Sequence, residues 1–305
     1  MDKENARALL DKPLGELMAL ADKVREECVG SRIELCNIMN AKSGLCAEDC
    51  KFCAQSCRHK TGVTTYPLKS IDKMLKAAFD AKDIGAERFD IVTSGNTLSS
   101  EELKRIADAI YLIKDRVRIK TCASLGKLSK EDLLLLKSAG LERYHHNIET
   151  SPGHFSVITT THSFKDRLDT IRAAKAAGLE VCSGGIIGLG ESWDDRIDMA
   201  LTLRDLDVTS VPINILVPIK GTPLGAASPV SAIDAVKTIA LFRIILRDKI
   251  IKLAAGRESF LKDFQAMAFM AGANGMLIGG YLTIKGRSID EDRLFVREME
   301  RAWKA

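Results

Sequence analysis

Three closely spaced cysteines, Cys46, Cys50 and Cys53, are the residues whose spacing points most directly to chemistry. Thiolates spaced in this way can each bind one iron of a four-iron cubane and leave the fourth iron open to a further ligand. The alternative is a structural zinc ion with a fourth ligand from elsewhere, but zinc ribbons use paired Cys-x-x-Cys units and the sequence has no second unit. The spacing therefore favours an iron–sulfur cluster with one open iron.

The remaining cysteines are Cys28, Cys36, Cys57, Cys122 and Cys182. The first residues contain no apolar signal-peptide core, and no apolar run approaches the roughly 18 residues of a membrane span. We therefore expect a cytoplasmic protein that does not enter membranes. In that compartment eight cysteines indicate metal binding or catalysis before disulfides.

Composition argues against nucleic acid as a partner. The net charge is only +4, the basic residues are dispersed among acidic ones, and aromatic residues make up 5% of the chain. Surfaces that stack nucleic-acid bases need aromatic side chains and a continuous basic track. The hydrophobic fraction of 46% and the charged fraction of 28% are instead ordinary for a soluble globular protein.

Short apolar runs and longer amphipathic runs alternate along the chain. The apolar runs predict strands at residues 33–39, 88–93, 117–122, 144–148, 180–187, 211–217, 252–255 and 276–278. The amphipathic runs predict helices at residues 71–81, 101–113, 130–138, 164–177, 193–206, 232–246 and 260–270. This alternation predicts an α/β fold, a (β/α)8 TIM-type barrel, because no Gly-x-Gly-x-x-Gly follows the first strand as in an open doubly wound sheet.

The first stretch, residues 5–28, has the leucine spacing of one amphipathic helix. We therefore expect an N-terminal helical extension at residues 1–30 and the barrel with its C-terminal elements at residues 31–305. The carboxyl ends of barrel strands share one mouth, where the chemistry gathers. The cysteine loop follows the first predicted strand and should lie at that mouth.

Several longer stretches resemble the biotin synthase family of radical S-adenosylmethionine enzymes. They are NAKSGLCAEDCKFCAQS at 40–56, YHHNIETSP at 144–152, VCSGGIIGLGE at 181–191, VPINILV at 211–217, KGTPL at 220–224, AGRE at 255–258 and MAGAN at 270–274. They run in family order from the first predicted strand nearly to the carboxyl terminus. The resemblance therefore covers most of the chain.

The resemblance implies that S-adenosylmethionine binds the open iron and is cleaved to a 5′-deoxyadenosyl radical. It implies conversion of dethiobiotin to biotin, with sulfur inserted from an auxiliary iron–sulfur cluster. The chemistry implies an electron donor such as flavodoxin or ferredoxin and the iron–sulfur assembly machinery, and we expect a homodimer. The alternatives are another radical enzyme of the same barrel type, such as a methylornithine-forming mutase or a hydrogenase-maturation protein, and a non-catalytic iron–sulfur or zinc protein.

The auxiliary cluster is where the sequence departs from the family. In the family three cysteines and an arginine hold this cluster, and Cys122, Cys182 and Arg257 match three of the four positions. The third cysteine position is occupied by Asp90. Cys36 lies on the neighbouring predicted strand, and alternating side chains of adjacent barrel strands reach nearly the same space. We therefore expect Cys36 to replace the missing ligand, around a two-iron cluster or a larger four-iron form.

The resemblance also implies residues that hold the nucleoside end of S-adenosylmethionine. Phe52 should pack near the adenine, and Ile186 should shape the same pocket. Asn147 and Glu149 match positions that bind the ribose hydroxyls, since a carboxylate is a natural acceptor for a diol. The backbone around Ser94 should bind the methionine amino group.

Two asparagines and a lysine are implied at the substrate. Asn147 should lie between the nucleoside and dethiobiotin, where it holds the radical carbon against the target C–H bond. Asn214 should pair with the ureido ring. Lys42 should meet the carboxylate of the substrate or of the cofactor. We interpret His145, where the family more often has asparagine, as a peripheral variation.

Overall fold

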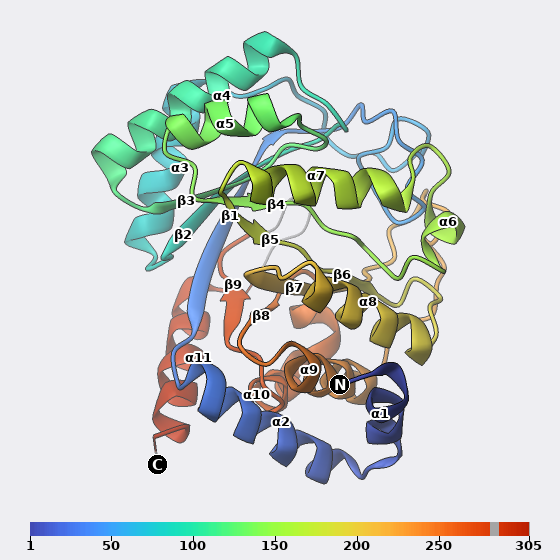
Figure 1. Cartoon of the computed structure of the whole chain (residues 1–305). Helices are drawn as coiled ribbons and strands as arrows, with labels where there is room; N and C mark the ends of the chain where they lie inside the picture. Colours follow the sequence, from blue (N-terminus) through green and yellow to red (C-terminus); the bar gives the residue numbers. More distant parts are fainter. Residues whose placement is uncertain (281–286, 305) are drawn as a thin grey trace.

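A ring of parallel strands closes at the centre of the molecule (Figure 1). The strands are β1 Glu34–Lys42, β2 Arg88–Thr93, β3 Lys120–Ser124, β4 Arg143–His145, β5 Glu180–Cys182, β6 Gly185–Ile187, β7 Ser210–Ile215, β8 Ile250–Leu253 and β9 Gly275–Leu277. The short strands β5 and β6 follow each other and both pair with β7, so they share one barrel position and close the ring. The predicted (β/α)8 barrel is confirmed in this computed structural model, which describes residues 1–280 and 287–304.

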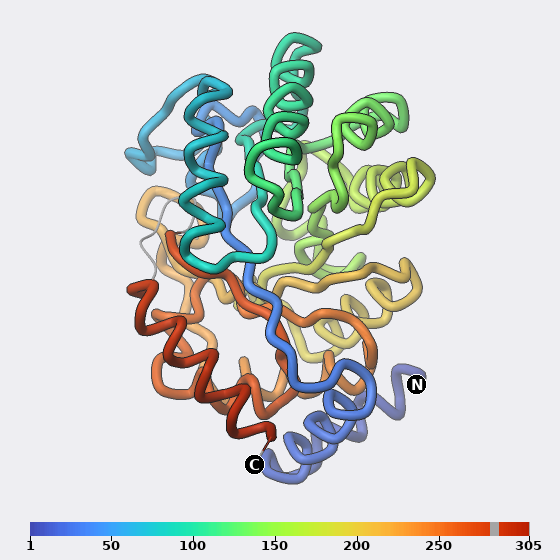
Figure 2. The backbone as a smooth tube through the Cα atoms, turned by 90° about the vertical axis from the view of Figure 1, so that its left-hand side faces the viewer, coloured from blue at the N-terminus to red at the C-terminus, as the bar shows by residue number. Residues whose placement is uncertain are grey.

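Helices cover the outside of the barrel, as the view in Figure 2 shows most clearly. They are α1 Lys3–Ala8, α2 Leu14–Val29, α3 Ile71–Asp83, α4 Ser100–Leu112, α5 Lys130–Ser138, α6 Phe155–Ile158, α7 Phe164–Ala176, α8 Trp193–Asp205, α9 Ala232–Leu246, α10 Gln265–Met270 and α11 Ile289–Ala302. A serine side chain accepts a hydrogen bond from the first-turn backbone of α3, α4, α5, α7, α8, α9 and α11. Such caps satisfy backbone N–H groups that no helical carbonyl reaches.

The prediction of one helix at residues 5–28 is wrong, because Pro13 separates α1 from α2. Proline has no N–H and suits the residue that precedes a helix, so the chain turns there. α1 then packs on α8 and α2 packs along α9. Arg25 of α2 places its guanidinium 4.1 Å from the ring centre of Trp303, which ties both ends of the chain to one end of the molecule (Figures 1 and 2).

Two other predicted elements are interrupted. The strand predicted at 180–187 breaks at Ser183 and Gly184, between β5 and β6. The helix predicted at 260–270 is divided into a π-helical turn Arg257–Leu261, a 3-10 turn Lys262–Phe264 and α10, because Lys262 has a positive φ of 45° that no continuous helix allows. Residues 281–286 and 305, part of the predicted 31–305 domain, lie outside the described residues.

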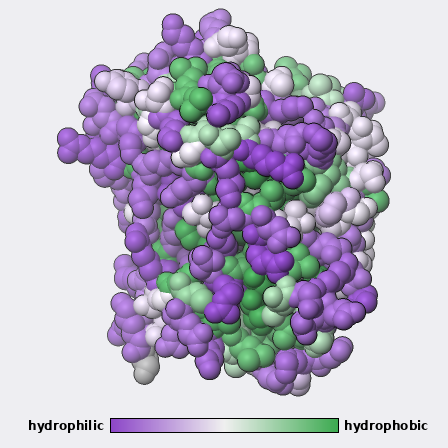
Figure 3. Space-filling view, in the orientation of Figure 1, coloured by the Kyte–Doolittle hydropathy of each residue, from purple (hydrophilic) through white to green (hydrophobic). Residues whose placement is uncertain are grey.

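The face seen in Figure 1 is mostly hydrophilic, with apolar side chains visible between the hydrophilic ones in both its upper and its lower half (Figure 3). No helix of the described residues is both long and apolar enough to cross a membrane.

Candidate active site

The cysteine loop after β1 folds back on itself. The Cys46 N–H donates to the Gln55 carbonyl at 3.0 Å, and the Cys57 N–H donates to the Cys46 carbonyl at 2.8 Å. Within the loop the Cys53 N–H donates to the Cys50 carbonyl at 2.9 Å. These bonds bring the two ends of the loop together, so that all three thiols of the triplet belong to one compact turn.

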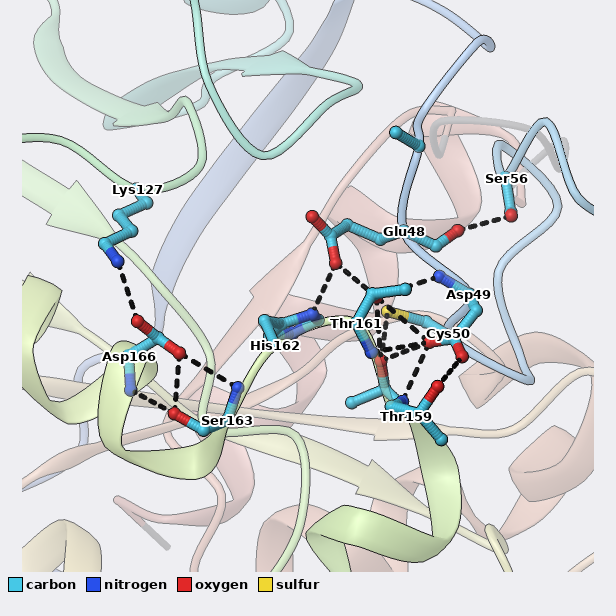
Figure 4. A network of polar contacts seen from close by, with 12 residues as sticks. Glu48, Asp49, Cys50, Ser56, Lys127, Thr159, Thr161, His162, Ser163 and Asp166 are labelled. Carbon is cyan, nitrogen blue, oxygen red and sulfur yellow. Dashed lines mark hydrogen bonds and ion pairs between the residues drawn. The ribbon is translucent and has the colours of Figure 1, made fainter.

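Acidic side chains fix this loop to the segment between α6 and α7 (Figure 4). Asp49 accepts from the Thr159 hydroxyl at 2.7 Å and from the Thr160 N–H at 2.9 Å. Burial opposes ionisation of Asp49, but the hydrogen bonds from Thr160 and Thr159 outweigh it and hold the pKa of this carboxyl below its usual range. Glu48 contacts Nδ1 of His162 at 2.7 Å. The loop is therefore held in place before any cofactor binds.

Burial makes two thiols of this loop harder to deprotonate. Burial raises the pKa of Cys50 to about 12, and burial also raises the pKa of Cys53. Within residues 1–280 and 287–304 no three His, Cys, Asp or Glu side chains converge closely enough to hold a single metal ion. The zinc alternative thus lacks a preformed ligand set, whereas thiolates of a cubane each bind a different iron and stand further apart.

A cavity of about 380 Å³ runs through the barrel interior to its mouth. The cysteines Cys36, Cys122 and Cys182 line it and are almost fully buried. Burial raises the pKa of Cys36 to about 11, and the pKa of Cys122 is raised by burial and then by the charges of Asp90 and Cys182. Three sheltered thiols that affect one another electrostatically fit an iron–sulfur group, whose binding requires their deprotonation.

Buried cations surround these inner thiols. Lys252 donates to the Cys36 sulfur at 2.8 Å and pairs with Glu34 at 2.7 Å. Arg143 pairs with Glu34 at 2.9 Å, and Arg88 lines the same cavity. Burial lowers the pKa of Lys252, but the charges of Cys36 and Cys182 outweigh burial and the net pKa is raised. The ammonium therefore stays charged, and it would compensate the negative charge that the Cys36 sulfur gains on deprotonation.

The polar residues that line the cavity include Asn147, Glu149 and Asn214. The Asn147 carbonyl oxygen accepts the Gly184 N–H at 3.1 Å, and its amide nitrogen faces Glu149 at 3.4 Å. Asn214 donates to the Gly185 carbonyl and accepts from the Ala255 N–H, both at 3.1 Å. Both amides are oriented by backbone and still have donor capacity directed at a ligand.

Family models match two segments of the chain. The Radical SAM superfamily matches residues 42–203, and the Biotin and Thiamin Synthesis associated domain matches residues 212–301. Biotin synthase from Thermotoga neapolitana is 55% identical over 271 residues, which cover 88% of this chain and 97% of that protein. Biotin synthase from Clostridium perfringens is 46% identical over 299 residues, which cover 98% and 93%. The chain belongs to the biotin synthase family.

Solved structures of other proteins share this barrel fold. Methylornithine synthase superposes with a TM-score of 0.84 at 21% identity, covering 98% of this chain and 92% of that one. The FeFe-hydrogenase maturase from Carboxydothermus hydrogenoformans superposes with a TM-score of 0.84 at 19% identity, covering 98% and 74%. At such identities the likeness concerns the fold alone. Membership of the biotin synthase and radical SAM families implies a four-iron cluster and S-adenosylmethionine as cofactors.

The structure places most of the residues predicted for a biotin synthase site at one cavity. The predicted residues that line it are Phe52, Asn147, Glu149, Ile186, Asn214, Cys36, Cys122 and Cys182. Its described lining does not include the outer cysteines Cys46, Cys50 and Cys53, although Phe52 between them lines it, and it does not include Lys42, Ser94 or Arg257. Lys42 pairs with Glu102 at 2.7 Å, and the Ser94 hydroxyl donates to the Gly44 carbonyl at 2.7 Å.

Arg257 lies in the turn after β8, and its guanidinium binds side chains that do not belong to the described lining of the cavity. Its guanidinium donates to Asp292 and to Gln265, both at 2.6 Å, and to the Leu277 carbonyl at 3.1 Å. Lys252, five residues earlier and on β8, contacts the Cys36 sulfur at 2.8 Å.

Sequence reasoning missed Lys252 and His145. Lys252 carried a signal, because a lysine in the short apolar run Ile250–Leu253 is unusual for a barrel strand. His145 was interpreted as peripheral, yet it lines the cavity between Asp90 and Asn147. Burial lowers its pKa, but the Cys182 charge and the Asp90 hydrogen bond outweigh burial and raise it to about 9.

Proposed function

We propose that this chain converts dethiobiotin to biotin by radical S-adenosylmethionine chemistry, with sulfur taken from an auxiliary iron–sulfur cluster. The observation that carries the proposal is one cavity shared by three buried cysteines and the strand-end residues Asn147, Glu149 and Asn214. A substrate bound there lies between the inner thiols and the mouth where the cysteine loop is fixed. The biotin synthase relatives, at 45% identity or more, support the same substrate.

The outer cysteines Cys46, Cys50 and Cys53 are assigned to the four-iron cluster. When bound and reduced, that cluster supplies the electron that cleaves S-adenosylmethionine to methionine and a 5′-deoxyadenosyl radical. The rigid anchoring of the loop through Asp49 supports this assignment, because the cofactor's amino and carboxylate groups must meet one fixed iron.

The chain's other residues bind and orient the cofactor. Glu149 accepts the ribose hydroxyls, and Phe52 and Ile186 enclose the adenine. Burial raises the pKa of Glu149, so its carboxylate gains from a diol that satisfies it. The backbone beside Ser94 binds the methionine amino group. Lys42 binds the carboxylate of the substrate or of the cofactor. To do so, its ammonium must leave the ion pair with Glu102.

Asn147 and Asn214 orient the substrate. Asn214 keeps one amide hydrogen and one oxygen lone pair beyond its two backbone bonds, which match the acceptor and donor of a cyclic urea. Asn147 lies beside Glu149 and therefore holds the nucleoside against the target C–H bond. Such positioning lowers the barrier by removing orientational freedom before the hydrogen atom moves.

Cys36, Cys122 and Cys182 are assigned to the auxiliary cluster, as a two-iron or a four-iron form. The burial of all three thiols and the nearby charges of Lys252 and Arg88 support this assignment. The resemblance leaves two roles for Arg257, a ligand or a neighbouring cation. Its ion pair with Asp292 favours the second role.

The remaining assignments follow from the same chemistry. The electron donor is a flavodoxin or ferredoxin, the assembly machinery supplies both clusters, and the protein acts as a homodimer in the cytoplasm. The domain division at residues 1–30 and 31–305 belongs to the proposal as well.

The test uses the anaerobically reconstituted protein with S-adenosylmethionine, dithionite and dethiobiotin. We expect 5′-deoxyadenosine and biotin, and we expect Cys36→Ser to lose the iron and the Mössbauer signal of the auxiliary cluster while it still forms deoxyadenosine. Cys28→Ser, which alters a half-buried thiol at the end of α2, is the matched control. Absence of deoxyadenosine from the wild type would contradict the enzyme assignment, and an intact second cluster in Cys36→Ser would contradict the ligand assignment.

A further inference from the structure

Asp90 and His145 form a hydrogen-bonded link between the inner cysteines and Asn147. Nδ1 of His145 lies 2.9 Å from Oδ2 of Asp90, and Nε2 lies 3.0 Å from the Asn147 amide oxygen. Asp90 is opposite Cys122 in the β2–β3 register, and His145 is opposite Cys182 in the β4–β5 register. The pair therefore spans from the wall of the cluster cavity to the residue assigned to the nucleoside.

The Gly184 backbone amide determines which groups donate and which accept hydrogen bonds along this link. The Gly184 N–H is only a donor, and it points at the Asn147 side chain at 3.1 Å, so the atom it meets must be the amide oxygen. His145 Nε2 faces that same oxygen and must therefore carry a hydrogen. With two donors on its oxygen, the Asn147 amide cannot rotate by half a turn, and its nitrogen stays on the Glu149 side.

The break between β5 and β6 is what delivers this amide. A Cβ on Gly184 would lie 2.0 Å from the Pro212 carbonyl oxygen, so only glycine fits there. The Gly184 carbonyl accepts from Ile148 and Glu149, which follow Asn147 in the chain. The strand interruption thus holds both the backbone and the side chain of the segment that carries Asn147.

We propose that Asp90 and His145 are positioning residues that fix the Asn147 amide for the radical step, and that Asp90 is not a ligand of the auxiliary cluster. This inference rests on the proposed function. Asp90 holds the His145 ring through Nδ1, and the ring holds Asn147 through Nε2. A carboxylate that orients an imidazole in this way is a common supporting arrangement around metal sites.

The competing role for Asp90 is that of an iron ligand of the auxiliary cluster. Its second oxygen, Oδ1, is buried and has no hydrogen-bond partner among the described residues. Asp90 is one of the residues that line the cavity, so its carboxylate is a candidate iron ligand. Asp90→Asn separates the two roles, because an amide oxygen still accepts from His145 but is a poor replacement for a carboxylate on iron.

The experiment measures biotin formed per deoxyadenosine, together with iron and sulfide content and the electron paramagnetic resonance spectrum of the reduced clusters. His145→Phe keeps the ring shape without N–H groups. We expect it to keep both clusters and to lower biotin per deoxyadenosine by about 10- to 100-fold, as a misplaced reacting group does. His145→Gln, which restores a donor to Asn147, should recover most of the coupling, and Asp90→Asn should keep its iron.

The control is His154→Phe, because His154 contacts the Leu189 carbonyl at 3.2 Å and does not belong to the described cavity lining. Normal coupling in His145→Phe overturns the positioning role. Loss of auxiliary iron in Asp90→Asn overturns the claim that Asp90 is not a ligand. If the wild type forms deoxyadenosine but no biotin, the proposed function fails and the role of the Asp90–His145 pair fails with it. If the wild type forms biotin, the results for the variants test the role of the pair alone.

Discussion

At the scale of single residues, a lysine ammonium in direct contact with a cysteine sulfur dominates the inner end of the cavity. Lys252 and Cys36 are both almost fully buried, and Glu34 binds the same ammonium. A buried charge needs partners on every side, and here one side is the sulfur that is assigned to iron. We therefore propose that Lys252 tunes and stabilises the auxiliary cluster that is assigned to Cys36, Cys122 and Cys182.

Replacing Lys252 with methionine tests this directly. Lys252→Met keeps the chain length but removes the donor to Cys36, so we expect auxiliary iron affinity to fall about 10- to 100-fold, as for other lost partners of metal ligands. Iron per chain, measured after dialysis against a chelator, should drop while deoxyadenosine formation persists. Lys120→Met, on an exposed position of β3, is the control and should keep its iron. Equal iron in both variants would contradict the assigned role.

The sequence predicted the cysteines better than their neighbours. A triplet with fixed spacing is a local pattern, so Cys46, Cys50 and Cys53 could be recognised without a structure. Arg257 could not be placed, because Asp292 binds its guanidinium from 35 positions along the chain. His145 and Lys252 act through contacts across strands, which no spacing records.

At the scale of elements, the break between β5 and β6 is the part of the barrel shaped most directly by the site. The sequence predicted one strand at 180–187 because apolar residues, Val181–Cys182 and Ile186–Ile187, lie at both ends of this short segment. It did not show that Gly184 and Gly185 must approach the carbonyls of Pro212 and Glu149 closely. Propensity describes a strand by itself, whereas this interruption is imposed by neighbours. The other helices and strands agree with their predictions to within a few residues at most ends.

Gly184→Ala tests this close approach. The added methyl would lie 2.0 Å from the Pro212 carbonyl oxygen, so β7 or the break must move. We expect a loss of about 1–3 kcal/mol in the free energy of unfolding, which is usual for overpacking. Urea unfolding followed by circular dichroism measures it. Gly15→Ala, in α2 with open space around it, should instead stabilise the fold by roughly 0.5–1 kcal/mol. Unchanged stability of Gly184→Ala would show that the backbone yields without cost.

At the scale of the whole molecule, a buried ion pair connects the carboxyl-terminal helix to the barrel. Asp292 of α11 is fully buried and pairs with Arg257 after β8 at 2.6 Å. The same guanidinium donates to the Leu277 carbonyl at the end of β9. Since β9 pairs with β1, this contact supports the point where the last strand meets the first.

Asp292→Ala should destabilise the whole fold. It leaves the Arg257 guanidinium buried with Glu258 as its remaining carboxylate, at 3.2 Å. Removing one partner of a buried ion pair lowers the free energy of unfolding by roughly 3–5 kcal/mol. We expect a loss near the lower end of this range, because Glu258 still compensates part of the Arg257 charge. Glu298→Ala, on the same helix with an exposed partner Arg301, should change stability by at most about 1 kcal/mol. Chemical denaturation of both variants gives the comparison, and similar midpoints would argue against a structural role for the pair.

Strand β1 also sets the separation between the inner Cys36 and the loop that carries the outer cysteines. Cys36 lies near its start, and the loop that carries Cys46, Cys50 and Cys53 begins just after Lys42, where the strand ends. Six residues of extended chain from Cys36 to Lys42 span about 20 Å. The length of this strand thus sets how long a bound molecule must be to reach from the outer cysteines to the inner ones. Adding two residues would lengthen that span by about 7 Å and leave every side chain on its original face.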